Sequence, residues 1–233
     1  MTGWLVGFDA DDTLWHNERA FRLTEDRFLA LLAPHAEERS LRARLLEAER
    51  RNLGLYGFGV KGFTLSMIET AIEATRGAVP AAVIAEILAS GREMLAHPIE
   101  LLPGAREAVE AASAAARVVL ITKGDLLDQE RKLAQSGLGE LFDAVEVVSD
   151  KTPDTYARLF RRHGGGEAVM VGNSLKSDVV PAIEAGGWGV HVPHGVHWAL
   201  DLAEPPRGHP RFREVPDLVQ ATAALRGIGA LPA

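Results

Sequence analysis

Hydrophobic residues in the second half of the chain gather into short runs that alternate with longer amphipathic segments. Short apolar runs bounded by turn residues predict buried strands, and apolar residues three to four positions apart predict helices. Strands are predicted at residues 5–8, 117–122, 144–149, 168–172 and 189–192. Helices are predicted at residues 105–115, 126–136, 153–163, 178–185 and 216–225, with a loop over 194–212. This alternation predicts an α/β fold, a Rossmann-like parallel sheet with helices on both faces.

The segment between the first two predicted strands has a different pattern, because its apolar residues recur at helical spacing from Asn17 to about Pro98. After a first helix, further helices are predicted at 36–52, at 64–76 with Thr64 as its cap, and at 80–96. Residues 53–63 contain four glycines and three aromatics, which predicts a shaped loop. We therefore expect a core made of residues 1–16 and 99–233 and an inserted α-helical domain of residues 17–98.

Composition narrows the classes of function. The chain has 233 residues and no Cys, which excludes disulfides and cysteine nucleophiles. Its formal net charge of −7 argues against a general nucleic-acid binder. No apolar run is long enough to predict a membrane span, and the first strand begins almost at Met1, which leaves no room for a signal peptide. We therefore expect a cytoplasmic protein with neither a nucleic-acid nor a membrane partner.

Clustered acids at the end of the first strand are the strongest chemical signal in the sequence. The apolar run 5–8 leads directly into Asp9, Asp11 and Asp12. Like charges at this spacing repel one another, so the cluster needs a cation, and a hard divalent metal prefers oxygen ligands. Asp9 and Asp11 lie two residues apart, so on an extended segment their side chains point the same way. One can then attack a substrate while the other transfers a proton.

Polar residues follow each of the other predicted strands. In open parallel sheets, chemistry collects at the carboxyl ends of the strands. Those ends carry Thr122-Lys123-Gly124, Ser149-Asp150-Lys151 and Gly172-Asn173-Ser174, and Asp178 opens the next helix. The 25 basic residues include only five lysines, and four of these (Lys61, Lys123, Lys151, Lys176) fall in predicted loops. An acid pair, a hydroxyl, an amine and a further carboxylate are thus predicted to converge.

These motifs resemble the haloacid dehalogenase-like (HAD) superfamily. Asp9-Ala10-Asp11-Asp12-Thr13-Leu14 is similar to its first signature, Thr122 to the second, and Lys151 to the third. Residues 172–178 resemble the fourth, G-D-x-x-x-x-D, with Asn173 in place of the usual first Asp, which removes one negative charge from the metal site. The resemblance implies a Rossmann-like core, a C1-type helical cap over 17–98, and Mg²⁺ as cofactor.

The resemblance also implies roles for individual residues. Asp9 is the expected nucleophile and Asp11 the acid and base, with Thr122 and Lys151 completing the catalytic set. The expected metal ligands are Asp9, Asp11 (through its backbone carbonyl), Asn173 and Asp178. The expected substrate contacts at the strand end are Thr122, Lys123 and Gly124. Independently of the resemblance, the glycine-rich loop predicted at 53–63 offers Tyr56 and Lys61 as further substrate contacts that would select the substrate. The alternative is that the aromatics of this loop fill the core of the helical domain and that Lys61 is solvated.

The expected function is Mg²⁺-dependent hydrolysis of a small phosphorylated metabolite. Members of the dehalogenase branch lack an acid two positions after the nucleophile, so Asp11 favours phosphatase chemistry. A phosphotransferase or mutase, a 2-haloacid dehalogenase-like hydrolase and a non-catalytic phosphate-binding module stay open as alternatives. His191, His194 and His197 recur at every third residue, but no carboxylate lies at a useful spacing, so we expect a loop near the rim of the site.

Overall fold

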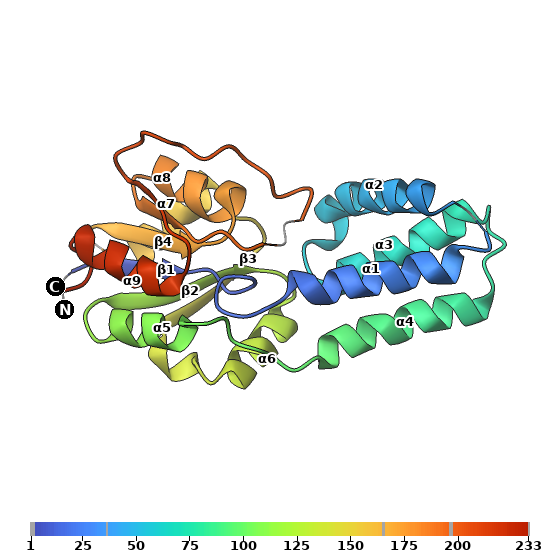
Figure 1. Cartoon of the computed structure of the whole chain (residues 1–233), viewed down its shortest axis with the longest axis horizontal. Coiled ribbons are helices and arrows are strands. Elements are labelled where there is room, and N and C mark those ends of the chain that lie inside the picture. Colours follow the sequence, from blue (N-terminus) through green and yellow to red (C-terminus); the bar gives the residue numbers. More distant parts are fainter. Residues whose placement is uncertain (1–2, 36, 165, 196–197, 233) are drawn as a thin grey trace. The chain divides into compact units, whose positions relative to one another are not determined.

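The computed structural model describes residues 3–35, 37–164, 166–195 and 198–232, and it divides the chain into two compact units (Figure 1). The core unit comprises Met1–Glu18, Ile99–Lys123 and Gln129–Ala233. The helical unit comprises Arg19–Pro98 and Gly124–Asp128. These boundaries lie within two residues of the expected division, except that residues 124–128 group with the helical unit. None of the helices in the described residues is both long and apolar enough to span a membrane.

The core unit is built on a parallel sheet whose strands follow the spatial order β3-β2-β1-β4-β5-β6. The strands are β1 (Leu5–Phe8), β2 (Arg117–Lys123), β3 (Ala144–Val148), β4 (Ala168–Gly172), β5 (Trp188–His191) and β6 (Phe212–Glu214). This order reverses between β1 and β4, which confirms the Rossmann-like α/β fold, and ligands bind at such a switch point. The short β6 was not predicted; it begins at Phe212, the last residue of the predicted loop 194–212, and continues beyond it.

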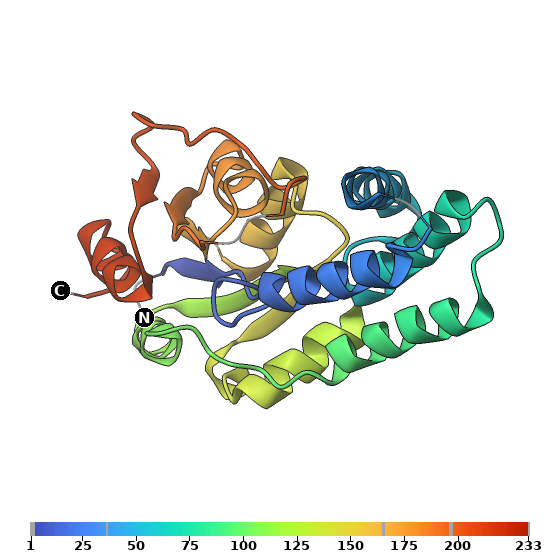
Figure 2. The same ribbon diagram turned by 45° about the vertical axis from the view of Figure 1, so that its right-hand side comes forward.

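Helices cover both faces of this sheet, and alternate residues of each strand face opposite layers. One layer packs Val6, Phe8, Val118 and Leu120 beneath α5 (Ala105–Ser113) and α9 (Leu218–Gly227), which lie side by side (Figure 2). Leu133 of α6 (Leu126–Ser136) joins this layer. The other layer packs Leu5, Val119 and Ile121 against α7 (Pro153–His163) and α8 (Val180–Glu184). The buried sheet therefore holds its strand ends in fixed positions.

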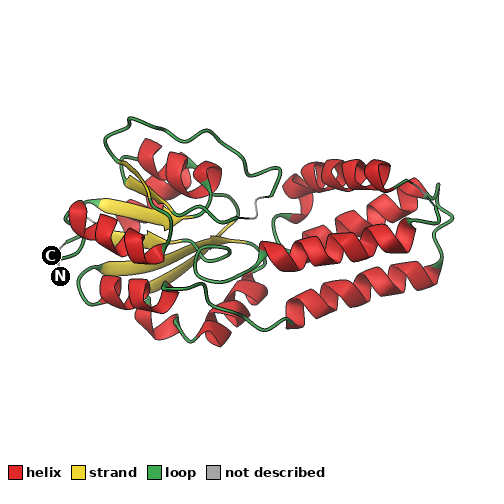
Figure 3. Ribbon diagram, in the orientation of Figure 1, coloured by secondary structure: helices red, strands yellow, loops and turns green. Residues whose placement is uncertain are grey.

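The helical unit contains α1 (Glu18–Leu32), α2 (Glu38–Tyr56), α3 (Val60–Ala74) and α4 (Ala81–Ala96), and Figure 3 shows no strand among its described residues. Its separate core includes Phe28, Leu45, Phe63, Met67 and Ile87. Most residues of the predicted loop 53–63 are helical, so this prediction was wrong, and only Gly57–Gly59 separate α2 from α3.

Gly62, a helical glycine of this segment, helps to explain the error because it serves close packing and not chain reversal, and Gly91 of α4 serves the same purpose where α4 meets α3. A Cβ on Gly62 would lie 2.9 Å from the carbonyl oxygen of Gly57, and a Cβ on Gly91 would collide with the Thr64 hydroxyl. Thr64 itself lies inside α3 and donates to the Val60 carbonyl, so it is not the predicted cap. Glycine therefore marks the close approach of α3 to its neighbours here.

Candidate active site

Asp9 lies immediately after β1, where its backbone N–H donates to the Val171 carbonyl of β4 at 2.9 Å. Its buried carboxylate accepts from the Lys151 ammonium at 2.5 Å through Oδ1 and from the Thr13 hydroxyl at 2.9 Å through Oδ2. Burial raises the pKa of Asp9 to about 7, with a further contribution from the Asp178 carboxylate that Lys151 partly offsets. The side chain is thus held by both oxygens at the switch point of the sheet.

Lys151 connects two carboxylates that come from different strand ends. Its Nζ lies 2.5 Å from Asp9 Oδ1 and 2.6 Å from Asp178 Oδ1, and all three side chains are buried. Burial alone would lower the pKa of Lys151, but the two carboxylates outweigh it and raise that pKa above its ordinary value. The carboxylates of Asp9 and Asp178 carry one more negative charge than the single Lys151 ammonium neutralises, and all three groups are buried.

Asp178 reaches this position because the chain makes a π-helical turn at Leu175–Val179 and does not begin a regular helix at residue 178 as predicted. The Ser174 hydroxyl caps the turn by accepting from the backbone N–H of Ser177, and the Ser174 N–H donates to Asp178 Oδ2 at 3.0 Å. A Cβ on Gly172 would collide with the Asp178 carboxylate. Glycine at the end of β4 is therefore required for this approach.

Asn173 lies beside the same carboxylates. Its backbone N–H donates to Thr13 Oγ1 at 3.0 Å, and its side-chain Oδ1 lies 3.2 Å from that hydroxyl. Asp9, Asp178 and Asn173 thus offer hard oxygen donors around an uncompensated negative charge, which fits a divalent cation such as Mg²⁺. The loss of charge at Asn173 leaves the two aspartates as the anionic donors.

Asp11 points to a different set of partners from Asp9. Its carboxylate accepts from Trp15 Nε1 at 2.7 Å, from Gln129 Nε2 at 2.8 Å, and from Lys132 Nζ at 3.0 and 3.1 Å. The Lys132 ammonium also donates to Asn17 Oδ1 at 2.8 Å. Because both carboxylate oxygens are engaged, Asp11 could contribute only its backbone carbonyl to a metal in this arrangement.

Gln129 and Lys132 are site residues that the sequence interpretation missed. They lie three positions apart on α6, a spacing that places them on one side of a helix. Lys132 was also the only lysine outside the predicted loops in a chain that otherwise uses arginine for most of its basic residues. That exception could have indicated a specific partner, and the structure shows the Lys132 side chain buried beside Asp11.

The residues predicted to bind phosphate at the end of β2, Thr122, Lys123 and Gly124, have three different environments. Thr122 is buried and its hydroxyl donates to the Lys123 carbonyl at 3.3 Å. The Lys123 ammonium donates to Ser177 Oγ at 2.7 Å, and burial lowers its pKa. Gly124 has a φ of 130°, favoured by glycine, and groups with the helical unit. Lys176, another lysine of the predicted loops, is exposed and donates to the Leu200 carbonyl at 2.6 Å.

The two predicted substrate contacts in the helical unit have partners there. The Tyr56 hydroxyl donates to Glu69 at 3.1 Å, and the Lys61 ammonium lies 3.3 Å from Asp125. Both side chains are well exposed. Their role in substrate selection stays a prediction.

The histidine series does not form one loop. His191 lies in β5, where its ring contacts Glu214 and the Asn173 carbonyl, each at 3.0 Å. His194 Nδ1 lies 3.6 Å from Asp12 Oδ1, so a carboxylate partner exists that sequence spacing did not reveal. Residue 197 lies outside the described residues.

Comparisons with known proteins agree with this geometry. The family model of the haloacid dehalogenase-like hydrolases matches residues 5–186. A haloacid dehalogenase-like family hydrolase from Xanthomonas campestris is 47% identical, with a TM-score of 0.87 over 97% of this chain and 92% of that one. A comparison with curated proteins found no match.

More distant solved structures share the fold. A predicted phosphoglycolate phosphatase from Haemophilus somnus is 18% identical, with a TM-score of 0.64 over 96% of this chain and 99% of that one. The L-2-haloacid dehalogenase from Xanthobacter autotrophicus is 20% identical, with a TM-score of 0.63 over 96% and 98%. Because the family model spans most of the sequence, this chain belongs to the haloacid dehalogenase-like hydrolases.

Proposed function

We propose that this hydrolase removes phosphate from a small phosphorylated metabolite through an aspartyl-phosphate intermediate on Asp9. The observation that carries the proposal is the presence of a second carboxylate, Asp11, two residues after the nucleophile. A halide leaves as a stable anion without a proton, whereas the alkoxide released from a phosphate ester needs one. Asp11 can supply that proton, which favours phosphate-ester hydrolysis over dehalogenation.

In the first step, an Asp9 carboxylate oxygen attacks phosphorus in line as the ester P–O bond breaks, and Asp11 gives its proton to the leaving oxygen. In the second step, Asp11 takes a proton from water, which attacks the same phosphorus. The bond between phosphorus and Asp9 breaks, and inorganic phosphate and the free carboxylate are released. Lys151 and Thr122 stabilise charge on the phosphoryl oxygens, with the N–H groups after Thr122 as further donors.

Asp11 must exchange partners during this cycle. As described above, both of its oxygens accept hydrogen bonds from Trp15, Gln129 and Lys132. To act as an acid, its carboxyl group must carry a proton and turn one oxygen toward the substrate. Lys132 and Gln129 therefore define the resting position of Asp11.

Mg²⁺ would be held by Asp9, Asn173, Asp178 and the Asp11 carbonyl, and it would offset negative charge on the phosphoryl group. The surplus of buried negative charge around Lys151 supports this assignment. Excess chelator should remove turnover, and Asn173→Asp should tighten Mg²⁺ binding in calorimetry because it restores one carboxylate. Full activity in chelator would exclude the metal from the reaction.

The decisive experiment is a screen of phosphorylated metabolites for phosphate release with Mg²⁺, in wild type and Asp9→Asn. Wild type should turn over at least one ester, and the variant should lose at least a thousandfold in kcat because an amide cannot attack phosphorus. A parallel assay for halide release from 2-chloropropionate tests the dehalogenase alternative. Candidate acceptor alcohols in the same screen separate hydrolysis from phosphotransfer. A folded Asp9→Asn protein that keeps its rate would contradict the mechanism.

A further inference from the structure

A second group of metal-ligand side chains lies in the core unit next to the catalytic motif. Asp12, His16 and His194 each offer one ligand atom, and these atoms all lie within 4.8 Å of one another. The His16 and His194 rings meet edge to face, with centroids 5.7 Å apart at 61°. Asp12 is buried and His194 is nearly so, with 14% of its side chain exposed. None of the three belongs to the set assigned to Mg²⁺.

The distance between Asp12 and His194 suits two ligands of one ion. At 3.6 Å, Asp12 Oδ1 and His194 Nδ1 are too far apart for a good hydrogen bond. Two ligands bonded at about 2.1 Å with a tetrahedral angle between them lie roughly 3.4 Å apart. The observed spacing is therefore close to the edge of a zinc coordination polyhedron.

The donor set differs in kind from the one around Lys151. Two imidazoles and one carboxylate favour zinc and neighbouring transition metals, whereas Mg²⁺ prefers oxygen donors alone. Three protein ligands also leave at least one position open for water or another small ligand. The chemistry thus points to a borderline transition metal.

Backbone hydrogen bonds hold two of the three ligand residues, Asp12 and His16, in the segment that precedes α1. Asp12 has a left-handed backbone with φ of 60°, and its carboxylate accepts from the N–H groups of Asn17 and Glu18 at 2.9 Å each. The backbone N–H of His16 donates to the Glu100 carbonyl at 3.1 Å. Hydrogen bonds of this kind orient metal-binding carboxylates in known sites. His194 belongs to a different segment of the chain, which follows β5.

We propose that Asp12, His16 and His194 form a transition-metal site, of the kind that takes Zn²⁺, separate from the Mg²⁺ set at Asp9. A bound ion would join the segment after β5 to the segment that leads into α1. It would thereby constrain both segments without taking part in phosphoryl transfer.

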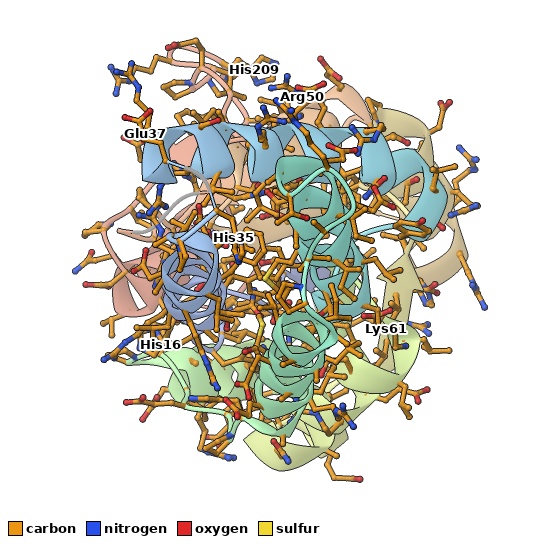
Figure 4. The ribbon with its side chains drawn as sticks, turned by 90° about the vertical axis from the view of Figure 1, so that its right-hand side faces the viewer. His16, His35, Glu37, Arg50, Lys61 and His209 are labelled. Atoms are coloured by element: carbon orange, nitrogen blue, oxygen red, sulfur yellow. The ribbon has the colours of Figure 1, made fainter. Side chains whose placement is uncertain are left out.

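The test uses tag-free full-length protein, Mg²⁺ in excess to occupy the oxygen site, and Co²⁺ and Zn²⁺ as probes. Calorimetry should detect one tight equivalent of Zn²⁺, and Co²⁺ should give the visible absorption of a nitrogen-containing site. His16→Ala and His194→Ala should each weaken binding at least tenfold, and Zn²⁺ should raise the Tm of wild type only. His209→Ala is the matched control, because this exposed histidine of the core unit lies well away from His16 (Figure 4).

Asp12→Asn provides a second variant, because the amide oxygen can still accept from Asn17 and Glu18 while the anionic ligand is lost. It should fold and bind Zn²⁺ more weakly than wild type. The proposal fails if wild type binds neither probe more tightly than His194→Ala does, or if all three variants keep wild-type affinity. Loss of binding in His209→Ala alone would assign the metal to another place.

Discussion

Ion pairs in the core unit and in the helical unit use similar charges in opposite surroundings. In the core, Lys151 is buried between two carboxylates, and only 8% of the Lys132 side chain is exposed beside Asp11. In the helical unit, Arg27 of α1 pairs with Glu86 and Glu93 of α4 at 3.2 and 2.7 Å, yet 44% of its side chain is exposed. Breaking a buried ion pair lowers the free energy of unfolding strongly, because one charge is left without a partner. Breaking an exposed pair lowers it little, because water replaces the lost partner.

This difference in burial explains why the core unit uses lysine near the strand ends and the helical unit uses arginine on its surface. A buried ammonium must be compensated at short range, and a compact lysine can sit between two carboxylate oxygens from different strands. Arginine on the helical surface keeps its charge in water while its stem covers apolar atoms. The charged residues near the strand ends are therefore expected to be functional, and those on the helices chiefly solvating.

Replacement of Lys151 should have the largest effect. Lys151→Met leaves Asp9 and Asp178 buried without their common partner, which should cost about 3–5 kcal/mol of unfolding free energy. Turnover should disappear as well. Urea denaturation without metal measures the first effect, and Lys176→Met is the control because Lys176 is an exposed lysine. A loss under about 1 kcal/mol would show that burial does not decide the strength of these pairs.

Replacement of Lys132 should mainly disturb Asp11. Lys132→Met removes the ammonium that holds both Asp11 oxygens, and a misplaced acid should lower kcat/KM about 100-fold. Because the change acts through a proton donor, the pH profile of kcat/KM should shift, which a purely structural role would not cause. Arg131→Met is the control, because Arg131 lies on the same helix, is only half-buried and donates to Gln135 Oε1 at 2.9 Å, so neither quantity should change. An unaltered pH profile with normal stability would separate Lys132 from the chemistry.

Replacement of Tyr56 or Lys61 tests whether exposed polar side chains of the helical unit take part in substrate selection. If these residues select the substrate, Lys61→Ala and Tyr56→Ala should lower kcat/KM for the preferred metabolite about tenfold, equivalent to about 1.4 kcal/mol. A small generic phosphate ester should be affected much less. Arg50→Ala is the control, since Arg50 is an exposed cation of the same unit that pairs with its helical neighbour Glu47 at 3.2 Å. Equal losses on both substrates would remove the selector role.

Replacement of Arg27 should have the smallest effect. Arg27→Ala breaks two exposed ion pairs between α1 and α4, and we expect a loss below about 0.5 kcal/mol. Thermal unfolding at low and high salt measures it, because salt screens exposed pairs. A loss comparable to that of Lys151→Met would invalidate the comparison between the two units.

The sequence was most informative where one physical requirement dominates. Buried apolar runs that end in acids fixed β1 and the position of Asp9, and the order of the later strand ends predicted Thr122, Lys151 and Asp178 together. The helical structure of most of residues 53–63 could not be predicted, because glycine marks loops but also permits close helix packing, as at Gly62. The partners of Asp11 were missed because Gln129 and Lys132 are more than 100 residues away in the sequence, where spacing gives no information.

The two segments that connect the core unit to the helical unit, residues 14–16 and 100–102, lie next to each other. Trp15 and Leu101 form an antiparallel bridge, the Leu102 N–H donates to the Leu14 carbonyl at 2.9 Å, and the His16 N–H donates to Glu100. The insertion therefore starts and ends at one place, outside the order of the parallel sheet. A segment attached in this way can be lengthened, shortened or exchanged for another fold without rethreading a strand, so evolution or a protein engineer can change it as a module while the strand ends keep their chemistry.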